Sequence, residues 1–187
     1  MKASLGAALA LAMLATSGAD AHTDASVQVP AAAAVATSPD KSIQVAITLD
    51  NDGRAAYAVT RRGTAILAPS RLGVLFTDTP KIERNLELIG KSTSSSDSSW
   101  TQPFGEWKSI RDNHTEFALR FREKTGLKRE MSVTFRIFDD GVGFRYSFPD
   151  QPNLHHANIA EELTEFAFAQ GGTAWWKQAY GWNREEY

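Results

Sequence analysis

The sequence predicts an all-β fold, an antiparallel β-sandwich, and two observations support it. No stretch of eleven residues holds the 3.6-residue apolar period of an amphipathic helix. Short alternating runs bounded by Gly, Pro, Asn or Asp recur along the chain instead. Because strands of this kind bury one face each, they enclose a core by packing as two sheets. We therefore expect many short antiparallel strands in two layers.

The first 21 residues have the features of a signal peptide. Lys2 supplies a positive charge, an apolar run covers 5–15, and Ala19-Asp20-Ala21 offers a small-residue cleavage site. The apolar run is too short to span a bilayer, and the chain has no cysteine for a lipid anchor or a disulfide. We expect a secreted, soluble, periplasmic protein with no membrane partner.

The mature chain is expected to start with a linker. Residues 22–37 are mostly Ala, Val, Thr and Ser without sustained periodicity, which predicts a disordered segment. The composition changes at Ser38, so we expect one folded domain over 38–187. Within it, alternating or apolar runs predict strands at 43–49, 57–61, 64–67, 72–76, 86–90, 115–122 and 163–168. Turns are expected at 50–53 and 62–63, a break at Pro69-Ser70, and a polar low-complexity loop over 92–99.

The segment 131–148 predicts a β-hairpin around an Asp140-Gly141 type I′ turn. Counting outward from that turn gives three core pairs: Ile137 with Phe144, Phe135 with Tyr146, and Val133 with Phe148. The same register sets Arg136 opposite Arg145, which is unfavourable unless a carboxylate on a neighbouring strand lies between them. We therefore expect an acidic neighbour there.

Composition and motifs exclude several functions. A net charge of −2 with interspersed signs does not suit nucleic acid. No phosphate loop, nucleophile elbow or zinc helix is present. Extending 50–53 as an EF-hand puts Thr48 at the first ligand position and Val59 where a Glu belongs, so a hairpin turn explains these residues better. His155-His156 has no evident partner for proton transfer.

Five tryptophans stand out, several of them close to glutamates. Their positions are Trp100, Trp107, Trp175, Trp176 and Trp182, near Glu106, Glu185 and Glu186. Aromatic faces beside carboxylates suit sugars, whose C–H groups pack on rings while their hydroxyls form hydrogen bonds. Filling the core of the sandwich is the other interpretation, and both stay open. Since the chain ends inside its densest aromatic segment, we expect a partial domain, incomplete at its C-terminus.

Several motifs together carry a family resemblance. They are Ser38-Pro39-Asp40, Pro69-Ser70-Arg71-Leu72-Gly73-Val74, Phe104-Gly105-Glu106 after Trp100, the hairpin sequence over 135–146, Glu162-Leu163-Thr164-Glu165-Phe166, Thr173-Ala174-Trp175-Trp176 and Trp182-Asn183-Arg184-Glu185-Glu186-Tyr187. In this order they resemble the N-terminal domain of glycoside hydrolase family 97, from about Ser38 to the last residue.

The resemblance implies a galactose-mutarotase-like β-super-sandwich, ahead of a catalytic barrel, in an exported bacterial α-glucosidase or α-galactosidase. The family's catalytic carboxylates lie in the barrel, so no catalytic residue is expected here. Glu186 resembles the N-domain carboxylate that helps hold an active-site calcium ion, and Glu185 stands where the family often has an aromatic residue. Trp175, Trp176 and Trp182 are the expected substrate-binding residues, for an oligosaccharide or glycoside.

Two alternative functions remain open at this point. A free-standing sugar-binding module would need Trp175, Trp176 or Trp182 exposed in a row. A mutarotase-like enzyme would need His155 or His156 to face one cleft with a carboxylate, and exposure of both histidines to solvent would rule it out.

Overall fold

The computed structural model describes residues 31–173 and residue 175. These residues contain strands and no helix, and hence no helix long and apolar enough to cross a membrane. The strands are β1 (Ala34–Thr37), β2 (Ile43–Leu49), β3 (Ala55–Arg61), β4 (Thr64–Arg71), β5 (Val74–Phe76), β6 (Leu86–Thr101), β7 (Ser109–Glu123), β8 (Glu130–Ile137), β9 (Val142–Ser147) and β10 (Ile159–Glu162). The predicted all-β class is confirmed.

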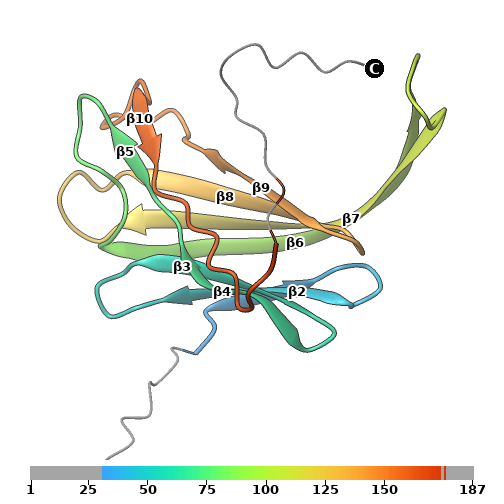
Figure 1. The fold of residues 1–187 in the computed structure, drawn as a ribbon. Helices are drawn as coiled ribbons and strands as arrows, with labels where there is room; N and C mark the ends of the chain where they lie inside the picture. Colours follow the sequence, from blue (N-terminus) through green and yellow to red (C-terminus); the bar gives the residue numbers. More distant parts are fainter. Residues whose placement is uncertain (1–30, 174, 176–187) are drawn as a thin grey trace, which may run out of the picture.

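The strands form two four-stranded antiparallel sheets that face each other (Figure 1). One sheet has the order β1-β2-β3-β4 and the other β6-β7-β8-β9, while β10 and β5 pair as a small third sheet. Consecutive strands are neighbours within each large sheet, as short hairpin connections require. This arrangement confirms the predicted antiparallel sandwich.

The core lies between the two large sheets. Alternate residues of β2 and β3 are buried on one side, and alternate residues of β7 and β8 on the other. The ring of Phe135 lies between the two sheets. Its centroid is 5.8 Å from that of Tyr57 and 6.3 Å from that of Phe117. Since the alternating runs of the sequence supply these residues, the binary pattern alone specifies most of the core.

The predicted linker is wrong over its last four residues. Residues 34–37 form β1, which pairs with β2 and sets Ala36 opposite Val45. Ala34 and Ala36 are buried, although their small side chains give the sequence no visible apolar alternation. Hydrogen bonds to β2 determine this strand, so the domain begins before the predicted boundary at Ser38.

The predicted serine-rich loop is also wrong, because β6 runs through the whole of 92–99. Its register against β7 is regular from Ser92, opposite Ala118, to Ser99, opposite Arg111. β6 is an edge strand, where polar side chains are tolerated and discourage pairing with other molecules. The hydrogen-bonded pairing with β7 therefore outweighs the weak strand propensity of serine.

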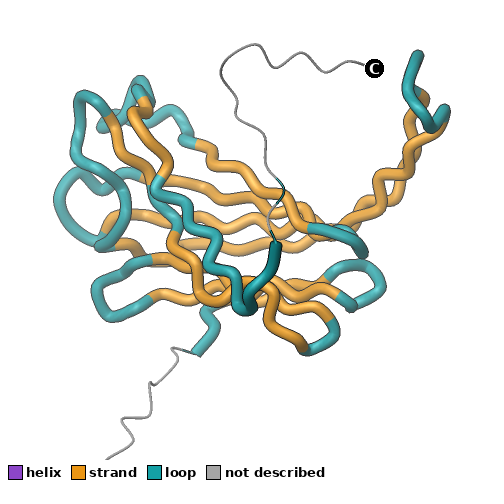
Figure 2. The backbone as a smooth tube through the Cα atoms, in the orientation of Figure 1, coloured by secondary structure: helices purple, strands orange, loops and turns teal. Residues whose placement is uncertain are grey.

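Beyond the sandwich, β6 and β7 continue as a two-stranded arm (Figures 1 and 2). Pairing between β7 and β8 ends at Thr115, so residues 109–114 of β7 pair only with β6. Arg111 donates two hydrogen bonds to the Asp97 carboxylate across the arm, at 2.8 and 2.7 Å. This bidentate contact links its two strands.

Two further strand predictions differ from the structure. β4 continues through the expected break at Pro69-Ser70, because Pro69 lies in an outer strand where a missing N–H is tolerated. The strand expected over 163–168 does not form, because β10 ends at Glu162 and only Phe168, in an isolated bridge to Leu67, pairs within that range. The segment still forms local backbone hydrogen bonds, since the Ala68 N–H donates to the Ala167 carbonyl at 2.8 Å.

The β8–β9 hairpin exists, but its predicted register is wrong. Arg136 lies opposite Gly143, Phe135 opposite Phe144, and Thr134 opposite Arg145. The error is two residues, and because side chains alternate with a period of two, every residue keeps its predicted face. Val133, Phe135 and Ile137 are fully buried as expected.

A tertiary contact explains the different turn. Residues 138–141 form a four-residue loop, and neither Asp140 nor Gly141 has the positive φ of a type I′ turn. Asp139 Oδ1 accepts a hydrogen bond from the Asp40 N–H at 2.9 Å, so the loop is tied to the β1–β2 turn. The expected acidic neighbour is confirmed for Arg136, whose Nε lies 3.5 Å from Glu116 Oε2.

Candidate functional site

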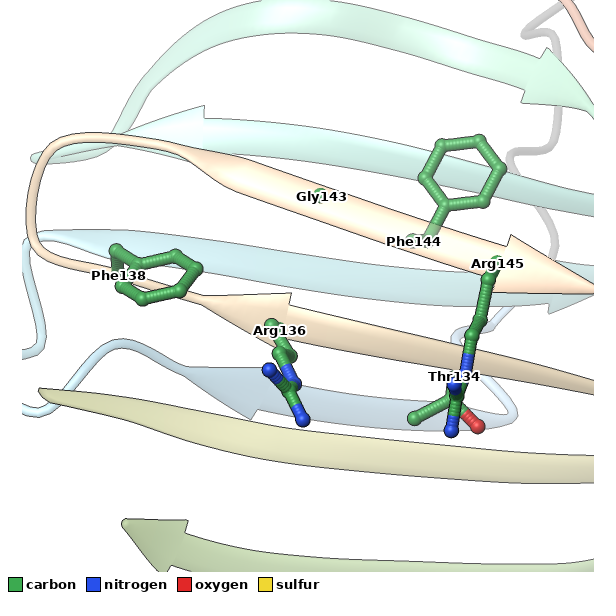
Figure 3. Close-up of a pocket in the computed structure, with 6 residues that line it drawn as sticks. All are labelled: Thr134, Arg136, Phe138, Gly143, Phe144 and Arg145. Carbon is green, nitrogen blue, oxygen red and sulfur yellow. The ribbon is translucent and has the colours of Figure 1, made fainter. Parts of the chain in front are cut away.

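A groove lies on the outer face of the β8–β9 hairpin (Figure 3). Its volume is about 290 Å³, and its lining residues are Thr134, Arg136, Phe138, Gly143, Phe144 and Arg145. The strand alternation produces it, since residues next to the buried Val133, Phe135 and Ile137 point outward. Gly143 leaves space at its centre, because a Cβ there would meet no atom within 4 Å.

The charges on this groove are unevenly paired. Arg136 has the half-buried Glu116 as its partner on β7. Arg145 lies opposite Thr134 and, among the residues that the structure describes, forms no ion pair. Two guanidinium groups therefore share one side of the hairpin, with a single carboxylate paired to them.

A buried histidine packs against Phe138, one of the groove residues. His114 is buried, its Nδ1 lies 2.6 Å from Asp112 Oδ1, and its ring packs against Phe138 with centroids 5.2 Å apart. The sequence reasoning missed this pair. The available signal was the Asp-x-His spacing directly before the predicted strand 115–122, since β7 extends through these residues and places both side chains on one face. The pair orients the His114 ring that packs against Phe138.

A second polar cluster joins β9 to the segment after β10. The Tyr146 hydroxyl lies 2.9 Å from Thr164 Oγ1 and accepts a hydrogen bond from the Gly73 N–H at 3.2 Å. Burial raises the pKa of Tyr146, so its hydroxyl stays protonated. Nearby, a hydrogen bond from Arg71 lowers the pKa of Glu165. These contacts hold the segment against the sandwich.

The structure describes only one of the four predicted site residues. Trp175 is 93% exposed, so it does not fill the core. Trp176, Trp182 and Glu186 lie outside the described residues, as does Glu185. The described part of the chain contains no group of three or more His, Asp or Glu side chains that could hold a metal ion. The predicted calcium contact and substrate contacts remain predictions.

Trp100 and Trp107 are placed at the end of the arm. Both are exposed, together with Phe104 and Glu106 between them, so core filling is the wrong interpretation for these two tryptophans. The loop has a defined shape, since Gln102 Nε2 donates to the Trp107 carbonyl at 2.6 Å. The arm thus presents aromatic side chains to solvent.

The remaining candidates behave as local structure. His155 and His156 are both exposed, and His155 Nδ1 lies 3.8 Å from the solvent-exposed Asp150, beyond hydrogen-bond distance. The condition that rules out the mutarotase-like enzyme is met. Residues 50–53 form the β2–β3 turn as predicted, with the Arg54 N–H donating to Asp50 Oδ1 at 2.8 Å.

Comparisons with known proteins agree on one family. The family model described as Glycosyl-hydrolase 97 N-terminal matches residues 36–187. The probable retaining alpha-galactosidase of Streptomyces bingchenggensis (strain BCW-1) is 28% identical over 171 residues, which make up 91% of this chain and 25% of that protein.

Solved structures show the same likeness. A glycoside hydrolase family 97 enzyme from Pseudoalteromonas sp. strain K8, in complex with acarbose, is 31% identical with a TM-score of 0.69, over 73% of this chain and 20% of that one. A beta-arabinopyranosidase is 27% identical with a TM-score of 0.66, over 73% and 21%. The chain therefore spans between a fifth and a quarter of the length of these relatives.

Proposed function

The chain belongs to the glycosyl-hydrolase 97 N-terminal family, and on that premise we propose that it is the non-catalytic sandwich part of a glycoside hydrolase acting on α-glycosides. The match over residues 36–187 carries the proposal and confirms the resemblance read from the motifs. The substrate would be an oligosaccharide or glycoside of α-glucose or α-galactose, in line with the alpha-galactosidase relative. Trp175, Trp176 and Trp182 would contribute to the wall of the sugar pocket.

The proposal includes a shared calcium site. A carboxylate such as Glu186 suits calcium, which takes six to eight oxygen ligands. Glu186 would act as one ligand of this site. A catalytic barrel, as the intramolecular partner, would provide the remaining ligands. The signal-like segment at 1–21 supports export to the periplasm.

The purified 187-residue chain should show no turnover of an aryl α-galactoside or an aryl α-glucoside, because the family resemblance places the paired catalytic carboxylates in the barrel and none in the sandwich domain. Calorimetry on the same sample should give a calcium dissociation constant no tighter than about 10⁻⁴ M. Glu186→Gln is the matched control and should leave that weak signal unchanged. Turnover that saturates with substrate, or tight calcium binding lost in Glu186→Gln, would contradict the proposal.

The exposure of Trp175 favours a second candidate, a free-standing sugar-binding module. A solvent-facing tryptophan can stack on a sugar ring without any catalytic domain. Titration with panose distinguishes the two candidates. Under the second candidate the chain binds panose, and Trp175→Ala weakens binding at least about tenfold, whereas Trp107→Ala on the arm does not. Absence of panose binding favours the leading proposal.

A further inference from the structure

We propose that the groove over β8 and β9 binds a carboxylated sugar ring of the hexuronate class. The inference rests on the residues that line this groove, and it does not depend on the proposed function. Three features carry it: two guanidinium groups on one side of the hairpin, a gap between them, and an aromatic ring at one end.

The cross-strand register creates the gap. Arg145 lies opposite Thr134, while Arg136 lies opposite Gly143, so the two arginines sit diagonally on the same face. Figure 3 shows both side chains extending to the same side of the hairpin. The glycine has no side chain to fill the space between them, and a Cβ there would touch no neighbouring atom. The space is open to a ligand.

The charges favour an oxyanion in this space. Glu116 pairs with Arg136 at 3.5 Å, a loose contact between partly exposed groups. Arg145 has no ion pair among the described residues. A guanidinium presents a planar fork of N–H donors that matches a carboxylate in bidentate fashion. A ligand carboxylate beside Arg145 would supply the charge that the protein does not.

The rest of the groove suits a sugar ring. Phe138 is half-buried, and its ring packs against the buried His114 with centroids 5.2 Å apart, which restricts its side chain. Apolar C–H groups of a pyranose pack well on such a ring, and the Thr134 hydroxyl can donate or accept a hydrogen bond. The volume, about 290 Å³, lies just below the usual range for ligand sites, which suits one ring and not a long chain.

Calorimetric titration at low salt tests the proposal, with glucuronate, glucose and inorganic phosphate as probes. Glucuronate should bind at least about tenfold more tightly than glucose, which lacks the carboxylate. Arg145→Gln and Gly143→Val should each weaken glucuronate binding at least about tenfold. Gly143→Val keeps both arginines and only fills the gap. Arg120→Gln, which removes an exposed arginine of β7, is the matched control and should change nothing.

Three results would contradict the proposal. Equal binding of glucuronate and glucose would exclude recognition of the carboxylate, and unchanged binding in Arg145→Gln would place it elsewhere. Phosphate binding as tight as glucuronate would exclude a contribution from the sugar ring. An unchanged thermal unfolding temperature of Gly143→Val would show that its effect is local, as expected because valine suits a strand and its Cβ would meet no atom within 4 Å.

Discussion

Phe135→Ala should lower the free energy of unfolding by about 3–5 kcal/mol. Phe135 has no exposed surface, and its ring contacts aromatic residues of both sheets. The centroids of Tyr57 and Phe144 lie 5.8 and 5.0 Å from its own. Alanine would leave a cavity where the sheets meet, because a close-packed interior relaxes only partly. Urea unfolding followed by far-UV circular dichroism measures the change.

Phe168→Ala is the matched control for this truncation. Phe168 is exposed, so the same chemical change should alter stability by no more than about 0.5 kcal/mol. The comparison separates burial from loss of an aromatic residue as such. If Phe135→Ala lost less than about 1 kcal/mol, Phe135 would not be a central core residue.

The core residues were predictable because the apolar alternation that specifies them lies within each strand. The alternation over 43–49 gives β2 with the observed bounds, and the burial of Val133, Phe135 and Ile137 follows from the same period. A one-residue error of register would have exchanged the two faces, but the actual error was two residues. The faces of the hairpin were therefore predicted correctly even though its turn was not.

The missed features depend on partners that are distant in the sequence. The turn after β8 is determined by the hydrogen bond between Asp139 and Asp40, 99 residues apart. The serine-rich part of β6 is a strand because β7 pairs with it throughout. Neither contact changes the strand or turn propensity of the residues around it, so sequence patterns alone do not reveal these contacts.

The candidate site likewise combines a feature that the sequence indicated with one that only the fold determines. Exposure of Trp175 agrees with the sugar-binding interpretation, which the motifs favoured but composition left open. The groove depends on the actual register, since the predicted pairing of Arg136 with Arg145 left no place for the gap at Gly143. An error of two residues in register thus preserves the core and changes the surface.

Arg129→Met should destabilise the fold by about 3–5 kcal/mol, as expected when one partner of a buried ion pair is removed. Arg129 is 1% exposed, and its Nε and Nη2 donate to the two oxygens of the buried Glu123 carboxylate at 2.9 and 2.7 Å. Its Nη1 donates to the Pro80 carbonyl at 2.7 Å, and its guanidinium lies 5.6 Å from the centroid of the Phe76 ring. Methionine fills similar space but leaves Glu123 buried without a counter-charge.

A double-mutant cycle shows whether the uncompensated charge causes this loss. Glu123→Gln removes the charge and keeps an acceptor for the Arg129 backbone N–H, which donates to Glu123 Oε2 at 3.0 Å. In the double variant Arg129→Met/Glu123→Gln no charge remains buried, so its loss should be smaller than the sum of the single losses by at least about 1 kcal/mol. Urea unfolding of the four proteins measures the coupling. Additive losses would mean that Arg129 stabilises the fold by packing against Phe76 and by bonding to Pro80, and not through its charge.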